Sequence, residues 1–166
     1  MNSARYFFLM GLTYFMGICP LVANAQKSEL TGIVSEEKII QNDRIFEIYI
    51  KRYQPDSTAI AYLANLNKEV NLKVFMGSWC RESRKYIPQL MKILQVADSD
   101  NIQVEYIAVN AQKNIPLSFL KNHQIKYIPT ILVFDDRNEL GRIVEKPQMP
   151  IELEIVEILK QAEKIE

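Results

Sequence analysis

The feature that most constrains this chain is a change of hydrophobic period between residues 72 and 96. Residues 72–76 form a mostly apolar run typical of a buried strand, and Gly77-Ser78 predicts the turn that ends it. Residues 83–96 then carry apolar side chains at helical spacing, which predicts an amphipathic helix. Trp79 and Cys80 therefore lie at a strand-to-helix junction.

The chain beyond residue 100 continues this alternation of strands and helices. We expect strands at residues 102–109, 130–134 and 140–144, a short helix at 117–122, and a final amphipathic helix at 151–162. The polar residues 135–138 predict the turn of an antiparallel hairpin. This order of elements predicts an α/β fold in which a mixed central sheet has helices on both faces.

Residues 26–55 are more polar, and we interpret them as a helical N-terminal extension that precedes the main domain at residues 56–166. Scattered apolar residues predict one or two short helices with a break near Asn42-Asp43. Pro55-Asp56-Ser57 predicts the end of one helix and the start of the next, which we expect to run to Asn67.

The first 25 residues have the pattern of a secretion signal peptide. Arg5 precedes an apolar stretch at residues 6–19, and Ala23-Asn24-Ala25 is typical of a signal-peptidase site, so we expect cleavage before Gln26. This predicts an extracytoplasmic protein, either periplasmic or secreted. The apolar stretch is too short to cross a bilayer, so we expect no stable membrane insertion after cleavage. The alternative is a membrane-tethered form, with the signal uncleaved or with a lipid on Cys19.

Charge and histidine content exclude several classes of function. The chain has 20 Lys plus Arg and 20 Asp plus Glu, so its net charge gives no reason to expect a nucleic-acid partner. The single histidine, His123, follows a predicted short helix without a second ligand nearby, which favours a surface or capping role. We therefore expect neither a metal nor a cofactor. The acidic clusters at residues 36–38 and 152–157 are interpreted as solvated helix faces.

Cys80 is the candidate reactive residue. The chain has two cysteines, and removal of the signal takes Cys19 away, so the mature protein can form no internal disulfide. A thiol at the first turn of a helix lies near unpaired backbone N–H groups and the positive end of the helix dipole, both of which stabilise the thiolate. Basic residues at positions 81, 84 and 85 add to this effect and Glu82 opposes it, so we expect a lowered pKa for Cys80.

Three motifs together resemble the thioredoxin family over residues 56–166. The sequence Trp79-Cys80-Arg81-Glu82-Ser83 resembles the Trp-Cys-x-x-Cys active site of thioredoxins, with serine in place of the second cysteine. Pro88 resembles the proline of the active-site helix, and Ile128-Pro129-Thr130 resembles the cis-proline loop of the family. One further departure is Val74, which stands where thioredoxins have a buried aspartate.

The resemblance implies a thioredoxin-like fold with an exposed Cys80 beside Trp79 and a cis peptide bond before Pro129. It implies that Cys80 and Ser83 are the catalytic positions. It also implies that Trp79 and residues 128–130 (Ile128, Pro129 and Thr130) bind the substrate, with the Ile128 backbone pairing to an extended substrate segment. The partners would be thiols and disulfides of proteins or small molecules.

Serine at position 83 changes the expected chemistry. A hydroxyl group cannot displace a captured sulfur by forming a new disulfide, so Cys80 can begin thiol-disulfide exchange but cannot complete it alone. Ser83 is instead a candidate hydrogen-bond donor to the Cys80 thiolate. The sequence leaves two hypotheses: monothiol exchange through a mixed disulfide at Cys80, and a redox-inactive module that uses the same groove to bind a protein.

Overall fold

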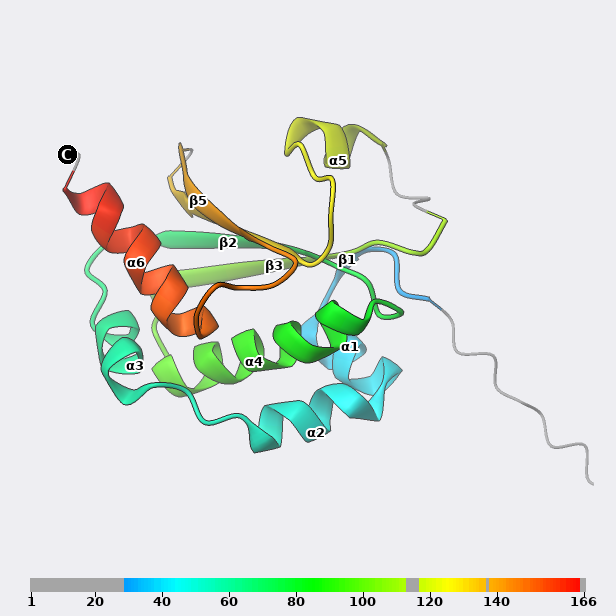
Figure 1. The fold of residues 1–166 in the computed structure, drawn as a ribbon, viewed down its shortest axis with the longest axis horizontal. Helices are drawn as coiled ribbons and strands as arrows, with labels where there is room; N and C mark the ends of the chain where they lie inside the picture. The colour runs from blue at the N-terminus through cyan, green and yellow to red at the C-terminus, as the bar shows by residue number, and fades with distance from the viewer. Residues whose placement is uncertain (1–28, 113–116, 137, 165–166) are drawn as a thin grey trace, which may run out of the picture.

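The computed structural model describes residues 29–112, 117–136 and 138–164 (Figure 1). The predicted signal at 1–25, with Cys19, lies outside the described residues. The helices are α1 (Glu36–Asn42), α2 (Arg44–Arg52), α3 (Ser57–Ala64), α4 (Arg81–Ala97), α5 (Leu117–Asn122) and α6 (Ile151–Glu163). The strands are β1 (Gly32–Val34), β2 (Val70–Met76), β3 (Ile102–Ala108), β4 (Thr130–Asp135) and β5 (Asn138–Val144).

The strands form one mixed sheet, which confirms the predicted architecture. Its five strands lie in the order β1-β3-β2-β4-β5. Strands β2 and β3 are parallel and are joined through α4, whereas β1–β3, β2–β4 and β4–β5 are antiparallel pairs. The pairing of Val74 with Tyr106 on one side and with Ile131 on the other puts β2 at the centre of the sheet.

Helices cover both faces of this sheet (Figure 1). Side chains alternate between the faces of a strand, so Val74 joins the large cluster packed under α4 and α6, and its neighbour Phe75 joins a smaller cluster on the α5 face. The smaller cluster also contains Ile107, Val109 and Leu132. The strand that leads to the predicted site is therefore buried on both sides.

The N-terminal segment, for which one or two short helices are expected, contains two, α1 and α2, and it also packs into the core of the main domain. Asp43 separates α1 from α2 and caps the second helix, where its carboxylate accepts a hydrogen bond from the backbone N–H of Ile45 at 3.1 Å. Ile39 and Phe46 are fully buried in the large cluster, and β1 adds an edge strand to the sheet through β3. The segment is thus continuous with the 56–166 unit.

Helix α4 carries the predicted active-site region and begins two residues earlier than its sequence pattern predicts. Pro88 lies inside this helix and is buried. The helix ends at Asp98, whose φ of 44° is left-handed. Its apolar face packs into the core through Ile87, Leu90 and Met91, which are fully buried, and this packing fixes the position of its first turn.

Two predictions on helices need correction. Helix α3 ends at Ala64, three residues before the predicted end at Asn67. Glu152 does not belong to a solvated face: it is 1% exposed, and its two carboxylate oxygens accept hydrogen bonds from the Tyr53 hydroxyl and the Asp56 backbone N–H, each at 2.8 Å. A buried carboxylate is tolerated here because both oxygens have donors. Among the described residues no helix is long and apolar enough to cross a membrane.

Candidate active site

Cys80 is the N-cap residue of α4, at the point where β2 turns into the helix. Its backbone is extended, its N–H donates to the Gly77 carbonyl at 3.0 Å, and its carbonyl accepts from the Arg84 N–H at 3.0 Å. The thiol therefore sits where the first N–H groups of a 17-residue helix have no helical partners.

The Cys80 sulfur has two polar neighbours. The carbonyl oxygen of Ile128 lies 3.5 Å from Sγ, and the Glu82 carboxylate lies 3.9 Å from it. Cys80 is only 9% exposed, so the expectation of an exposed thiol needs correction. The residue lies between the start of α4 and the Ile128 loop, which together cover most of it.

The loop at residues 127–130 is held rigidly beside the sulfur. The Ile128–Pro129 peptide bond is cis. The Thr130 hydroxyl donates to the Tyr127 carbonyl at 2.8 Å, and the Pro129 carbonyl accepts from the Glu145 N–H at 2.7 Å. These two bonds orient the loop so that the Ile128 carbonyl faces Cys80. Thr130 itself is 2% exposed, and its hydroxyl bonds within the loop.

Trp79 lies partly over this region and is 43% exposed. Its indole N–H donates to the Val109 carbonyl at 2.9 Å, which fixes the ring. Trp79 and Ile128 line a small hollow of about 50 Å³ together with Tyr127, which is 57% exposed. A Cβ at Gly77 would lie 2.9 Å from the Ile128 side chain and 3.0 Å from the Trp79 ring, so only glycine permits this close packing.

Ser83 lies one turn below Cys80 and is fully buried. Its hydroxyl oxygen accepts a hydrogen bond from the Gly77 backbone N–H at 3.1 Å. Among the hydrogen bonds of the described residues, Ser83 has none with Cys80. Its role here is to hold the turn that precedes Trp79. Val74, at the other departure from the thioredoxin pattern, is fully buried among apolar side chains.

His123 packs between two aromatic rings, away from the site. Its ring centroid lies 5.6 Å from that of Phe75 and 6.1 Å from that of Phe134. Burial lowers the pKa of this imidazole, and the nearby Lys73 ammonium lowers it further. In the part of the chain that the structure describes, no three potential metal ligands come together.

The structure thus brings four of the predicted site residues together: Trp79, Cys80, Ile128 and Pro129. Sequence reasoning missed Val109, which anchors the indole, because nothing in an apolar strand marks one carbonyl as an acceptor. It noted Glu82 only as an opposing charge, although this carboxylate contacts the sulfur.

The comparisons with known proteins identify the family. A family model described as Thioredoxin matches residues 33–162. This chain belongs to the thioredoxin family. The match begins inside β1 and covers α1 and α2. None of the curated proteins matches the chain.

Several solved structures resemble this thioredoxin-family chain. A protein of unknown function from Pseudomonas aeruginosa is 19% identical, with a TM-score of 0.56 over 79% of this chain and 87% of that one. An HIV epitope scaffold is 18% identical, with a TM-score of 0.53 over 78% and 87%. Mitochondrial thioredoxin 3 from Saccharomyces cerevisiae, in its oxidised form, is 17% identical, with a TM-score of 0.42 over 55% and 80%. The first two likenesses show a shared fold. The match to the thioredoxin family is consistent with thiol-disulfide chemistry in general.

Proposed function

We propose that this thioredoxin-family chain is an exported protein that exchanges disulfides through Cys80 alone. One observation carries the proposal: the sulfur lies at the start of α4, 3.5 Å from the Ile128 carbonyl, while the residue one turn further along is a buried serine bonded to Gly77. The site has a nucleophile beside a loop with a cis-proline, and position 83 supplies no second thiol.

The exchange begins with the Cys80 thiolate. It attacks one sulfur of a substrate disulfide, so that the bond between the two substrate sulfurs breaks and a new bond joins Cys80 to one of them. The other substrate sulfur leaves as a thiolate and takes a proton from solvent. With valine at position 74, Glu82 is the carboxylate in contact with the sulfur and is placed to accept the proton of Cys80 before the attack.

The exchange ends only when a second thiol arrives. A thiolate of the substrate, or of a small thiol, attacks the mixed disulfide and releases Cys80 as a thiolate, so the protein undergoes no net oxidation or reduction. The products are a rearranged disulfide in the first case and a disulfide of the small thiol in the second. This route favours isomerisation, or removal of a small-thiol adduct, over reduction.

The substrate segment would bind along the Ile128 loop. An extended backbone beside Ile128 would bring its cysteine to Cys80, and the partly exposed rings of Trp79 and Tyr127 offer apolar contact on one side. Because Cys80 is 9% exposed, an extended or locally unfolded segment would reach the sulfur more easily than a disulfide inside a folded domain.

Export is part of the proposal and rests on residues 1–25. A basic residue, an apolar stretch and small residues follow one another in this segment, at Arg5, residues 6–19 and Ala23-Asn24-Ala25, and this order supports cleavage before Gln26. Disulfide-bearing substrates are common outside the cytoplasm. Mass spectrometry of the protein recovered from the extracytoplasmic fraction would test this. A mature chain beginning at Gln26 is expected. An intact N-terminus, or a lipid on Cys19, would contradict cleavage.

A second candidate function is a redox-inactive module that binds a protein in the same groove. The low exposure of Cys80 favours it, because a covered thiol reacts slowly with a large disulfide. In this alternative, Trp79 and the Ile128 loop bind an extended segment and the sulfur is a packing group.

A trapping experiment separates the two functions. In a Cys19→Ser background Cys80 is the remaining cysteine, and incubation with a disulfide-linked peptide followed by intact mass measurement detects a covalent adduct. We expect one adduct, at Cys80, and none in the matched Cys80→Ser chain. Unchanged affinity for the peptide in Cys80→Ser, with no adduct in the parent, would instead support the binding module.

A further inference from the structure

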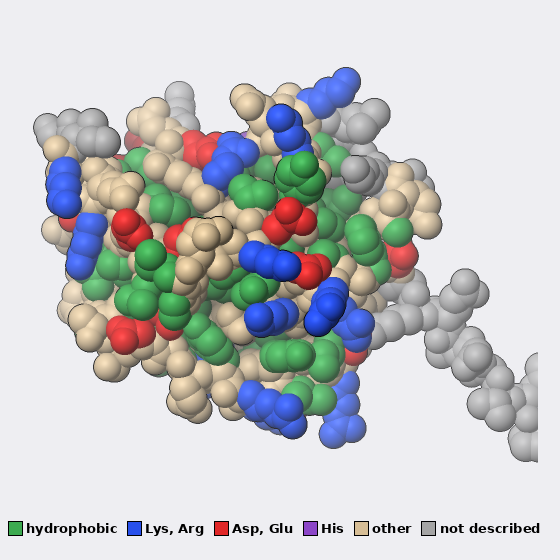
Figure 2. All heavy atoms as spheres, in the orientation of Figure 1, with side chains coloured by type: hydrophobic (Ala, Val, Ile, Leu, Met, Phe, Trp, Pro, Cys, Tyr) green, Lys and Arg blue, Asp and Glu red, His purple; other side chains and the backbone are tan. Residues whose placement is uncertain are grey.

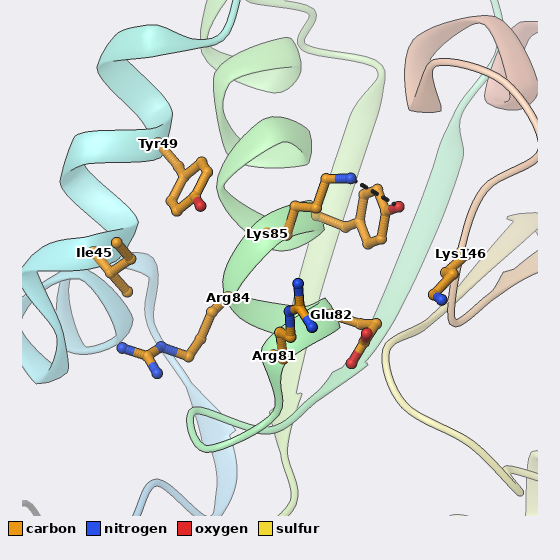
Figure 3. A pocket seen from close by; sticks show the side chains of 8 residues that line it. Ile45, Tyr49, Arg81, Glu82, Arg84, Lys85 and Lys146 are labelled. Carbon is orange, nitrogen blue, oxygen red and sulfur yellow. Dashed lines mark hydrogen bonds between the residues drawn. The ribbon is translucent and has the colours of Figure 1, made fainter.

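A basic cleft adjoins the active site through Glu82. It has a volume of about 550 Å³ and lies between α2, the first turns of α4 and the loop that follows β5 (Figure 3). One wall presents Ile45 and Tyr49 from α2, Arg81 and Lys85 come from α4, and Lys146 comes from the loop. The Lys85 amine donates to the Tyr86 hydroxyl at 3.2 Å. Figure 2 shows basic side chains gathered with apolar ones over this part of the surface.

The charge of this cleft is strongly unbalanced. Four of its lining residues are basic, and Glu82 is the acidic one. Arg84 is neutralised by Asp43, since their side chains lie 2.7 Å apart. Within the described residues, no carboxylate forms an ion pair with the other three basic side chains, Arg81, Lys85 and Lys146. Three cations therefore face a cavity without acidic partners of their own.

The cleft is connected to the reacting sulfur through Glu82. This residue lines the cleft, and its carboxylate lies 3.9 Å from Cys80 Sγ. The Ile128 carbonyl oxygen lies 3.5 Å from the same sulfur, and Ile128 lines the small hollow together with Trp79. The two cavities share no lining residue. One lining residue of each cavity, Glu82 and Ile128, contacts the Cys80 sulfur, so an extended ligand that reaches both cavities runs past Cys80.

We propose that the basic cleft binds the acidic residues of a polypeptide whose cysteine reacts at Cys80. The inference rests on the proposed exchange function and names its substrate class: a segment with apolar or aromatic side chains on one side of the cysteine and Asp or Glu on the other. An extended chain advances about 3.3 Å per residue, and Glu82 both lines the cleft and contacts the Cys80 sulfur, so acidic residues close to the cysteine in sequence reach the cleft. A cavity of this size has room for several side chains.

Charge complementarity gives this interaction a measurable signature. Cations around a cavity attract an acidic segment over a distance and raise its association rate, and added salt screens this attraction. Selectivity for acidic peptides should therefore be strong at low ionic strength and weak at high ionic strength.

The test compares two synthetic peptides in the Cys19→Ser background. Both carry one cysteine as a disulfide with a chromophoric thiol. One has Asp and Glu on both sides of the cysteine, and the other has Asn and Gln at the same positions. We expect the acidic peptide to react with Cys80 about tenfold faster at low ionic strength, the lower end of electrostatic steering. In Lys85→Gln/Lys146→Gln the ratio of the two rates should fall toward one, whereas Lys121→Gln, on α5, should leave it unchanged.

Equal rates for the two peptides, or a preference that the double substitution does not alter, would overturn the proposal. If neither peptide reacts, the exchange chemistry fails, and fluorescence anisotropy of the labelled acidic peptide on the Cys80→Ser chain still tests the cleft separately. Binding there must weaken in the Lys85→Gln/Lys146→Gln variant. A competition experiment adds a tripeptide thiol that carries two carboxylates. If it competes as strongly as the full peptide, small anions and not polypeptides occupy the basic cleft.

Discussion

The hydroxyl oxygen of Ser83 accepts a hydrogen bond from the Gly77 backbone N–H at 3.1 Å, across the turn that joins β2 to α4. Both residues are buried, and the bond fixes the backbone that presents Trp79 and Cys80. Serine at this position thus replaces a resolving thiol with a structural contact.

Replacing Ser83 by alanine should destabilise the protein. The Gly77 N–H would lose its acceptor inside the protein, which costs about 1–3 kcal/mol for a buried donor. Chemical denaturation measures the change in unfolding free energy. Ser57→Ala, at an exposed position of α3, serves as the control and should have a much smaller effect. An unchanged stability in Ser83→Ala would mean that the bond to Gly77 does not hold the turn.

Glu152 should be a major structural residue, in contrast to its exposed neighbour Glu157. Replacement by alanine leaves the Tyr53 hydroxyl and the Asp56 N–H without their acceptor, at a cost of about 2–4 kcal/mol. Tyr53→Phe should cost less, and in Glu152→Ala it should have almost no added effect, which a double-mutant cycle measures. Additive effects of the two substitutions would contradict the contact. Glu157→Ala is the matched control on the same helix.

His123 should make stability depend on pH. Its folded pKa is lowered because burial and Lys73 disfavour the charged ring; Arg142 acts in the same direction, while Glu139 and Glu105 oppose it. The folded state therefore binds this proton more weakly than the unfolded state, in which the ordinary value is 6.5. The contribution to stability is present above pH 6.5 and is lost as pH falls through the folded pKa.

The variant His123→Phe isolates this effect, because it keeps an aromatic ring between Phe75 and Phe134 without a titrating group. Thermal unfolding at several pH values should show that the parent loses stability relative to His123→Phe as the pH falls below 6.5. Parallel stability curves for the two proteins would show that the imidazole does not titrate differently on folding.

Trp79 provides an internal probe of substrate binding, because it is the one tryptophan of the chain and lies beside Cys80. Its ring is 43% exposed in the free protein. A peptide bound at Cys80 should cover the ring and shift its fluorescence to shorter wavelength. The same peptide added to Cys80→Ser gives the contribution of reversible binding. No shift on formation of the adduct would place the substrate away from Trp79.

The sequence is sufficient to predict the sheet, the principal helices and the meeting of Cys80 with the Ile128 loop. These depend on long periodic segments and on motifs whose order is informative. The sequence does not predict strand β1, because three residues are too short to show a strand pattern. Its central side chain, Ile33, is exposed in the structure. It forms only because the edge of β3 is available for pairing.

Long-range contacts explain the remaining differences. The sequence around Glu152 suggests a solvated residue, but in the structure Glu152 accepts a hydrogen bond from Tyr53, which is 99 positions away in the chain. The basic cleft combines α2, α4 and the loop with Lys146, and no local pattern marks Lys146 as its neighbour. The low exposure of Cys80 likewise depends on the position of the Ile128 carbonyl across the turn.

The central claim is that Cys80 captures a sulfur that position 83 cannot displace, and Ser83→Cys tests it most directly. Both chains, in the Cys19→Ser background, are loaded at Cys80 with a peptide disulfide, and release of the peptide is followed by intact mass without added thiol. We expect a persistent adduct in the chain with Ser83. The Ser83→Cys chain should release the peptide rapidly, because the introduced thiol forms a disulfide with Cys80. Equal release from both chains, or no adduct with Ser83, would contradict it.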